Sequence, residues 1–409
     1  MKILHTSDWH LGRTLYGRRR YEEFAAFLHW LAEVIEERGI EVLLVAGDVF
    51  DTSTPGNRAQ ELYYRFLCRV AASCCRHVVV VAGNHDSPSF LAAPKELLRA
   101  LDIHVIGMLG ERPEDEVLVL KDRAGKPELI VCAVPFLRDR DIRLAEPGES
   151  IEDKDRRLIE GIRDHYAGVA DAAERMRQEL GAGIPVVAMG HLFTAGGRTA
   201  DNDGVRELYV GSLAHVPAGI FSPVFDYLAL GHLHVPQAVG GSPTARYSGS
   251  PLPMGFGEAG QQKSLCLLSC SGRAIAVEQL PVPPFQRLER LRGDWGQLAA
   301  GIAGLAASGE SIWLEVIYEG AELAGDLRRH LAEAVAGTAI EILRVKNHRV
   351  IEQTMGRTDA EETLGDLQPE EVFDRCLKLH DVPEEQASGL RLAHREIVAT
   401  LAAEDLRAE

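Results

Sequence analysis

The sequence predicts an α/β protein, because apolar strands and amphipathic helices alternate from its first residues onward. Residues 42–46 and 78–82 are aliphatic runs rich in valine, typical of strands buried on both faces, and residues 2–7 read as a third strand. Between the strands, apolar side chains recur at helical spacing over residues 21–35 and 58–72. This order predicts a parallel sheet that is covered on both faces.

The strand pattern continues to residue 269 and predicts a first domain over residues 1–280. Further strands are expected at residues 129–134, 185–189, 227–230 and 263–269, and a long helix at residues 152–180. In parallel sheets, ligands gather at the carboxyl ends of strands. The residues that follow each strand are therefore the first candidates for a functional site.

A smaller second domain is expected after the proline-rich run at residues 281–284. Residues 285–345 alternate strand, helix, strand, helix and strand, which predicts a small α+β domain. Residues 346–366 are polar and are expected to form a linker. Residues 367–409 predict two amphipathic helices, whose apolar stripes either pack on the protein's own core or dock on a partner.

Composition narrows the class of protein. The chain has 409 residues, enough for more than one domain, and 46% of them are apolar. No run of about 18 apolar residues occurs, so we expect a cytoplasmic, nucleoid-associated protein without a membrane span. The seven cysteines lack CxxC spacing and are expected to be reduced thiols.

The net charge of −17, taken alone, argues against a nucleic-acid partner. However, the acidic excess lies mainly in the last sixty residues, whereas the first hundred carry equal numbers of basic and acidic side chains. The sequence has no G-x-x-x-x-G-K-[ST] run, so no ATP site of the P-loop type is expected in this chain.

Polar side chains follow five of the predicted strands. An isolated histidine is usually a hydrogen-bonded core or surface residue, but five such clusters in one order are not expected by chance. The clusters are Asp8-x-His10, Gly47-Asp48, Gly83-Asn84-His85-Asp86, Gly190-His191 and Gly231-His232-x-His234.

These side chains predict a site for two metal ions. They supply four imidazoles, two carboxylates and one amide oxygen, in addition to the His85-Asp86 pair, which is too many ligands for one tetrahedral zinc. Mixed nitrogen and oxygen donors favour manganese, iron or zinc over calcium or magnesium. A carboxylate such as Asp48 can bridge two ions about 3.5–4 Å apart, and such pairs neutralise phosphate oxygens.

The clusters resemble the motifs of the calcineurin-like metallophosphoesterases. Within that superfamily, longer runs resemble the SbcD family, the nuclease subunits of bacterial SbcCD complexes and relatives of the archaeal and eukaryotic double-strand-break repair nuclease. These runs are Thr6-Ser7-Asp8-Trp9-His10-Leu11-Gly12, Gly47-Asp48-Val49-Phe50-Asp51, Asp226-Tyr227-Leu228-Ala229-Leu230-Gly231-His232-Leu233-His234 and Arg246-Tyr247-Ser248-Gly249-Ser250-Pro251. The resemblance implies a β-sandwich flanked by helices in αββα layers, then a small α+β capping domain and C-terminal helices.

The resemblance also implies a role for each site residue. Asp8, His10 and His234 would hold one metal, and Asn84, His191 and His232 the other, with Asp48 as the bridge. His85 would contact the scissile phosphate and protonate or stabilise the leaving oxygen, and Asp86 would fix its tautomer. Relatives often carry a histidine where this sequence has Asp51, so the resemblance supports no phosphate contact there.

The implied activity is metal-dependent hydrolysis of DNA, as an exonuclease on duplex ends and an endonuclease on hairpins and single strands, in repair and recombination. Manganese is the expected metal, with Mg²⁺, Fe²⁺ and Zn²⁺ as alternatives. The alternative functions are a phosphatase or cyclic-nucleotide phosphodiesterase of the same superfamily, or a catalytically silent scaffold on this fold.

The resemblance implies three kinds of partner. DNA would be contacted by basic residues after the first cluster, for which Arg13, Arg18, Arg19 and Arg20 are the candidates. The alternative is that these arginines are solvated side chains at the start of a helix. An SbcC-like ATPase would bind the C-terminal helices, and a second copy would pair through the nuclease domain within a heterotetramer.

Overall fold

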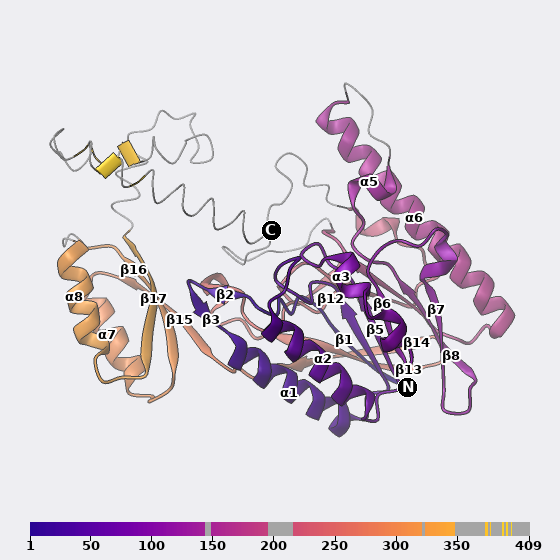
Figure 1. Cartoon of the computed structure of the whole chain (residues 1–409), viewed down its shortest axis with the longest axis horizontal. Helices are drawn as coiled ribbons and strands as arrows, with labels where there is room; N and C mark the ends of the chain where they lie inside the picture. Colours follow the sequence, from indigo (N-terminus) through magenta and orange to yellow (C-terminus); the bar gives the residue numbers. More distant parts are fainter. Residues whose placement is uncertain are drawn as a thin grey trace. The chain divides into compact units, whose positions relative to one another are not determined.

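The computed structural model describes residues 1–143, 149–194, 216–320 and 324–347, together with Phe373, Asp374, Leu377, Ala387, Leu390, Arg391 and His394. The chain divides into two compact units, Met1–Arg287 and Leu288–Glu409. Figure 1 shows both units and labels most of their helices and strands.

The first unit contains two six-stranded sheets, as far as the described residues show. The first sheet has the order β14 (Ala274–Pro281), β13 (Ser264–Ser271), β1 (Lys2–Thr6), β4 (Val42–Ala46), β5 (His77–Val81) and β6 (Ile103–Ile106). Strands β1, β4, β5 and β6 are parallel to one another, whereas β13 runs antiparallel to both of its neighbours.

The second sheet has the order β11 (Gln237–Val239), β12 (Ser242–Tyr247), β10 (Tyr227–Gly231), β9 (Val186–His191), β8 (Pro127–Ala133) and β7 (Val117–Lys121). Its central strands β8, β9, β10 and β12 are parallel. The edge strands β7 and β11 are antiparallel to their neighbours.

Helices cover the outer face of each sheet, so the layers are helix, sheet, sheet and helix. On the first sheet, α1 (Tyr21–Arg38) and α2 (Asn57–Ala71) lie side by side and bury Phe27 and Tyr63. On the second sheet, the long helix α6 (Ile151–Leu180) buries Tyr166. The predicted α/β fold with αββα layers is confirmed.

A third core lies between the two sheets, and strand β5 shows how the sequence builds it. Val78 and Val80 pack in the core under the helices, whereas Val79 and Val81 pack in the core between the sheets. This alternation is what a strand buried on both faces requires. The first sheet is therefore covered on both faces as predicted, but one of the covers is a second sheet.

Short elements complete the first unit. They are the hairpin β2 (Thr14–Leu15) and β3 (Arg18–Arg19), the helices α3 (Pro88–Ala92), α4 (Lys95–Arg99) and α5 (Asp139–Ile142), and the 3₁₀ turns η1 (Pro113–Glu116), η2 (Ala218–Ile220) and η3 (Phe256–Glu258). None of the helices in the described residues is long and apolar enough to cross a bilayer.

In its described residues up to 347, the second unit has a three-stranded sheet and two helices. Its strands are β15 (Arg287–Gly293), β16 (Ile312–Tyr318) and β17 (Ile340–Asn347), with β16 in the centre, and its helices are α7 (Trp295–Ala306) and α8 (Ala324–Val335). Leu298 of α7 and Leu331 of α8 pack on Leu314 and Val316. The expected linker lies outside the described residues from residue 348 to 366.

The two predicted C-terminal helices lie mostly outside the described residues. The seven described positions beyond residue 370 are all helical. The ring of Phe373 stacks on that of His394, with centroids 4.1 Å apart, and Arg391 Nε donates to Asp374 Oδ1 over 2.6 Å. These contacts pair the residues near 374 with those near 391.

Candidate metal centre

The five polar clusters meet at one edge of the β-sandwich, because parallel strands present their carboxyl ends on the same side. Glycines at the strand ends allow the close approach. A Cβ on Gly83 would overlap the Asp48 side chain, and a Cβ on Gly231 would overlap the Ala46 carbonyl oxygen. The glycine before each of these clusters therefore provides space for its neighbours.

The backbone at the site is unusual as well. A positive φ is uncommon for a residue other than glycine, and it concentrates where surrounding structure enforces it. Four cluster residues adopt one: Asp8 (54°), His10 (48°), Asp48 (50°) and His232 (102°). Hydrogen bonds from Asp8 N to Gly47 O and from His10 N to Asp48 O hold the first cluster against the second.

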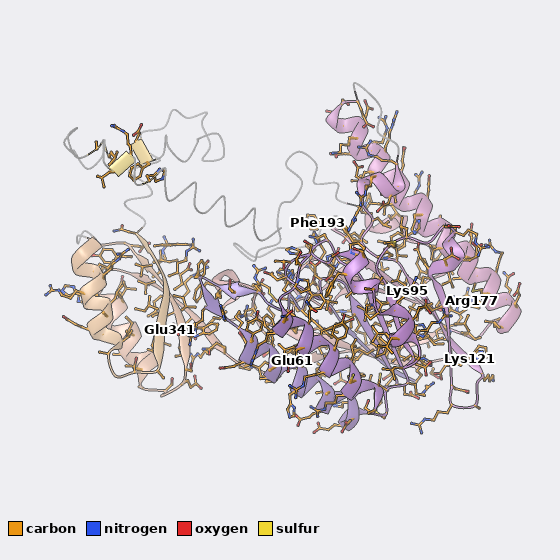
Figure 2. The ribbon with its side chains drawn as sticks, in the orientation of Figure 1. Glu61, Lys95, Lys121, Arg177, Phe193 and Glu341 are labelled. Atoms are coloured by element: carbon orange, nitrogen blue, oxygen red, sulfur yellow. The ribbon has the colours of Figure 1, made fainter. Side chains whose placement is uncertain are left out.

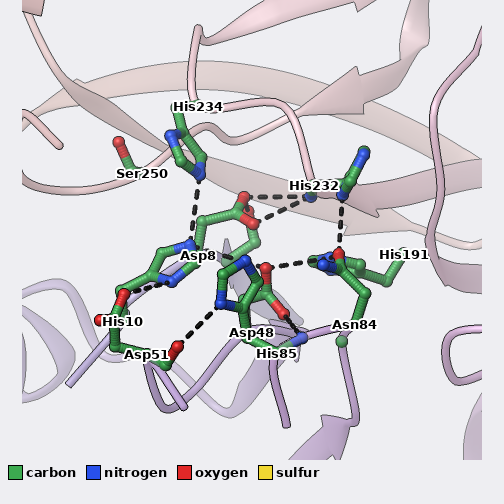
Figure 3. Close-up of polar contacts among 12 residues, drawn as sticks. Asp8, His10, Asp48, Asp51, Asn84, His85, His191, His232, His234 and Ser250 are labelled. Carbon is green, nitrogen blue, oxygen red and sulfur yellow. Dashed lines mark hydrogen bonds and ion pairs between the residues drawn. The ribbon is translucent and has the colours of Figure 1, made fainter. Parts of the chain in front are cut away.

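We call Asp8, His10 and His234 the first donor group. One ligand atom of each lies within 4.8 Å of the other two, and all three residues are buried. The Nε2 atoms of His10 and His234 face each other at 3.2 Å (Figure 3). The Asp8 carboxylate accepts hydrogen bonds from Ser7 Oγ and from the backbone N–H of His232.

We call Asn84, His191 and His232 the second donor group. Asn84 Oδ1 lies 3.0 Å from His191 Nε2 and 2.9 Å from His232 Nδ1. His191 Nδ1 lies 2.9 Å from the backbone oxygen of Ala46 and can only donate to it. In the neutral ring this bond leaves the lone pair on Nε2, facing the other two members of the group.

Asp48 stands between the two groups. Its Oδ2 lies 3.6 Å from His10 Nε2 and 3.3 Å from His191 Nε2, so one oxygen faces both groups. Its Oδ1 accepts a hydrogen bond of 2.9 Å from the backbone N–H of His85. The side chain is almost fully buried.

Each donor group contains one histidine that is easier to protonate and one that is harder. Burial opposes protonation throughout, but Asp48 raises the pKa of His191 to about 9. Burial and the neighbouring His191 lower the pKa of His232 to about 3. In the first group, burial lowers the pKa of His10, whereas Glu258 overcomes burial and raises the pKa of His234.

A buried ion pair lies behind the first donor group, and the sequence did not indicate it. Glu258 Oε1 lies 3.5 Å from His234 Nδ1, and Lys263 pairs with Glu258 and donates to the His234 backbone oxygen. Although burial opposes ionisation, Lys263 lowers the pKa of Glu258 to about 2. No spacing rule links Glu258 to the histidines, because η3 reaches the site only in the fold.

His85 and Asp86 differ from the prediction. The Nδ1 atom of His85 lies 2.8 Å from the backbone oxygen of Asp51, and this carbonyl, rather than Asp86, fixes the ring. The Asp86 carboxylate instead accepts three backbone N–H groups, from Gly83, Val49 and Phe50. Among the described residues it forms no hydrogen bond to the His85 ring, and it ties the loops after β4 and β5 together.

Asp51 contacts both histidines on this side of the site. Its carboxylate lies 3.4 Å from His10 Nδ1 and 3.3 Å from Arg13 Nη1, while its backbone oxygen receives His85. Arg13 is thus paired with an acid in the first unit. The motif Gly47-Asp48-Val49-Phe50-Asp51 contained this residue, but its backbone role had no signal in the sequence.

The expected DNA-contacting arginines separate into two kinds. Arg18 and Arg19 are exposed in β3, on a hairpin whose Tyr16 stacks on Phe256. Arg20 is 2% exposed and forms two hydrogen bonds to Glu23, so the prediction that it contacts DNA is wrong. The spacing of Arg20 and Glu23, three residues apart at a helix start, was the available signal.

The donor set fits two transition-metal ions. Each group brings at least one imidazole nitrogen and one oxygen to a common point. Seven donors with one shared carboxylate match the ligand count of a two-metal centre.

Comparison with known families gives two matches. The calcineurin-like phosphoesterase family matches residues 1–236. The family described as the type 5 capsule protein repressor C-terminal domain, SbcD_C, matches residues 284–381. The first match contains all seven donors.

Three curated relatives are each named as the SbcD component of the nuclease SbcCD. The protein of Escherichia coli strain K12 is 36% identical over 407 residues, covering 99% of each chain. That of Rhodobacter capsulatus is 38% identical over 297 residues, covering 70% of this chain and 71% of its own. That of Bacillus subtilis is 36% identical over 271 residues, covering 66% of each.

Proposed function

We propose that this chain, which belongs to the calcineurin-like phosphoesterase family and within it to the SbcD components of SbcCD nucleases, is a metal-dependent DNA nuclease. Membership in the phosphoesterase family makes it a hydrolase that uses divalent metal ions. The nuclease activity comes from the named relatives, of which the Escherichia coli protein matches over the whole length.

One observation supports the proposal most strongly, namely the position of Asp48. A single carboxylate oxygen that faces a histidine of each donor group is suited to bridge two ions. Two divalent ions held by these groups would supply Lewis-acid stabilisation of a phosphate and activation of a water. A single-metal site has no use for the second group.

In this proposal the first donor group holds one ion and the second group holds the other. His191 is oriented for this by the Ala46 carbonyl, and His234 by Glu258, the kind of outer contact that fixes the tautomer of a metal-binding histidine. Asn84 contributes a neutral oxygen, so the centre keeps a net positive charge that attracts phosphate.

His85 serves as the proton donor to the leaving oxygen. Because Nδ1 donates to the Asp51 carbonyl, the proton to be transferred sits on Nε2. The ring lies against His10, with centroids 4.8 Å apart, so Nε2 is held beside the first donor group. General acid catalysis of this kind contributes roughly 10²–10⁴-fold to a rate.

The decisive experiment incubates the purified chain, with and without an SbcC-type partner, with a DNA hairpin and with a linear duplex. Mn²⁺ is the expected metal, and Mg²⁺, Fe²⁺ and Zn²⁺ are compared with it. We expect Mn²⁺-dependent cleavage that Asp48→Asn abolishes. If the protein hydrolyses a small phosphomonoester and cleaves no DNA, its function is that of a phosphatase and the nuclease proposal is wrong.

Arg18 and Arg19 are the arginines that we propose to contact the DNA backbone, since both are exposed beside the site. The α+β domain at residues 285–345 would then cap the DNA end. Replacing either arginine with alanine is expected to weaken binding uniformly across sequences and to reduce the salt slope by about one. An unchanged slope would remove these residues from the interface.

The remaining proposals concern protein partners. An SbcC-like ATPase would bind residues 367–409 beyond the linker at 346–366, and two copies would pair through residues 1–280. A chain ending at residue 347 should lose the ATPase partner in co-purification but keep Mn²⁺-dependent cleavage. If the shortened chain still binds the ATPase partner, the binding surface lies within the first 347 residues.

A further inference from the structure

His77, Asp102 and His104 form a second set of metal-binding side chains, which we call the peripheral cluster. One ligand atom of each lies within 4.8 Å of the other two. His77 begins β5, and His104 lies in β6, the edge strand of the first sheet. Asp102 occupies the turn that leads into β6, with a φ of 57°.

The peripheral cluster is at the opposite end of the sheet from the metal centre. Strand β5 begins at His77 and runs toward Asn84 and His85, and the strand alone spans about 13 Å at 3.3 Å per residue. In Figure 2, Lys121, which contacts His77, and Phe193, which lies beside His232, are labelled far apart on the first unit. The two sets share no side chain.

The strand register places the two imidazoles on one face. Val79 pairs with His104 between β5 and β6, and His77 lies two residues before Val79. Val79 and Ile106 pack toward the second sheet, so His77 and His104 share that side by strand alternation. The rings lie 6.3 Å apart between centroids.

His77 is oriented like a metal ligand. Its Nε2 lies 2.8 Å from the backbone oxygen of Lys121 and must donate to it, which leaves the lone pair on Nδ1. The residue is only 9% exposed, and Nδ1 has no hydrogen-bond partner among the described residues. A buried imidazole nitrogen without a partner costs free energy unless something binds it. A backbone carbonyl on the other ring nitrogen is the usual outer contact of a ligating histidine.

The other two members are available for the same ligand. Within the part of the chain that the structure describes, neither the His104 ring nor the Asp102 carboxylate forms a hydrogen bond. Burial and the neighbouring His77 lower the pKa of His104, so its ring is neutral at neutral pH and can offer a lone pair. Asp102 is exposed, which leaves the open side of the cluster to solvent.

We propose that the peripheral cluster binds one divalent transition-metal ion, best matched by Zn²⁺, through His77 Nδ1, the His104 imidazole and the Asp102 carboxylate. Two imidazoles and a carboxylate with a fourth position open to water are a common zinc ligand set. The ion joins the edge strand β6 to β5 and to the turn before β6. The proposal does not depend on the proposed function.

The test measures zinc content and thermal unfolding of the full chain. After equilibration with Zn²⁺ and removal of free metal, His104→Ala should contain one equivalent less than the wild type. Added Zn²⁺ should raise the melting temperature of Asp48→Asn, whose metal centre is impaired, and this rise should disappear in Asp48→Asn/His104→Ala. Co²⁺ added to Asp48→Asn should give visible d–d absorption, and Asp48→Asn/His104→Ala should lose this absorption.

Two further variants protect the test against a folding defect. Asp102→Asn keeps a residue that tolerates positive φ and should weaken zinc binding at this site about tenfold or more. His29→Ala removes an exposed histidine of α1 and should keep the full zinc content. Equal zinc content in the wild type, His104→Ala and Asp102→Asn would overturn the proposal, whatever the nuclease activity.

Discussion

The two donor groups of the metal centre offer similar ligands but are supported in different ways. Behind the second group, the main-chain oxygen of Ala46 fixes His191. Behind the first group, the Glu258 side chain fixes His234 and is itself held by the buried Lys263. A main-chain support cannot be changed by substitution, whereas a side-chain support can. The first group should therefore be the one whose support a substitution can remove without changing the second group.

The largest effect is expected from Asp48, because this residue faces both donor groups and belongs to neither alone. Asp48→Asn should abolish cleavage and remove the magnetic coupling between two bound Mn²⁺ ions, measured by electron paramagnetic resonance. The reason is that an amide lacks the charge to bridge two cations. Asp164→Asn, an exposed carboxylate of α6, is the matched control and should behave like the wild type. Persistent coupling would show that the groups are joined in another way.

His85→Ala is expected to have the next largest effect, a loss of about 10²–10⁴-fold in kcat with both metal equivalents retained. The ring contacts His10 but is not needed by either donor group, since its Nδ1 is bound to Asp51. Single-turnover kinetics measures the rate of cleavage, and metal analysis of the same sample measures the bound metal equivalents. If a metal equivalent is lost, His85 is a ligand of the first group.

Glu258→Gln should weaken metal binding by roughly 10–100-fold at the first group only. It also leaves Lys263 buried without a counter-ion, which is expected to cost about 3–5 kcal/mol of unfolding free energy. The double variant Glu258→Gln/Lys263→Met removes the stranded charge and should recover most of the stability but not the metal affinity. Calorimetric titration with Mn²⁺ and urea unfolding measure the two effects. Equal weakening at both groups would refute the asymmetry.

The smallest expected effect is on pH dependence, and it belongs to the second group. In the metal-free protein the pKa of His191 is raised to about 9 by Asp48, above the usual value of 6.5. The stabilisation from this pair is therefore complete below about pH 6.5 and is lost as the pH rises through about 9. Mn²⁺ affinity should increase over the same window, because the metal competes with the proton. Urea unfolding of the metal-free protein between about pH 6.5 and pH 9 measures this loss of stability. A constant free energy of unfolding over that range would contradict the prediction.

The periodicity of the sequence predicts the strands of the first sheet and the clusters that follow them. Val42–Ala46 is buried along its whole length, and a short aliphatic run of this kind is typical of a strand that is covered on both faces. The existence of a second sheet was not readable from this pattern, because a buried strand looks the same whether a helix or a sheet covers it. The layered arrangement came from the family resemblance.

The supports of the site were less predictable than its donors. The sequence suggests that Asp86 is a catalytic neighbour of His85. In the structure, its carboxylate instead accepts hydrogen bonds from three backbone N–H groups, which folding brings together from two loops. Arg20 reads as one of three basic residues and is buried by its pairing with Glu23. Glu258 and the Asp51 carbonyl depend on loop paths that no local pattern encodes.

The donors of each group come from distant parts of the chain, and this has a consequence for biosynthesis. The first group joins Asp8 and His10 to His234, and the second joins Asn84 to His191 and His232. A nascent chain therefore carries two members of the first group and one member of the second long before the remaining members have been translated. Neither group can close until β9 and β10 have joined the sandwich. A growing or prematurely terminated chain that lacks them cannot assemble the centre.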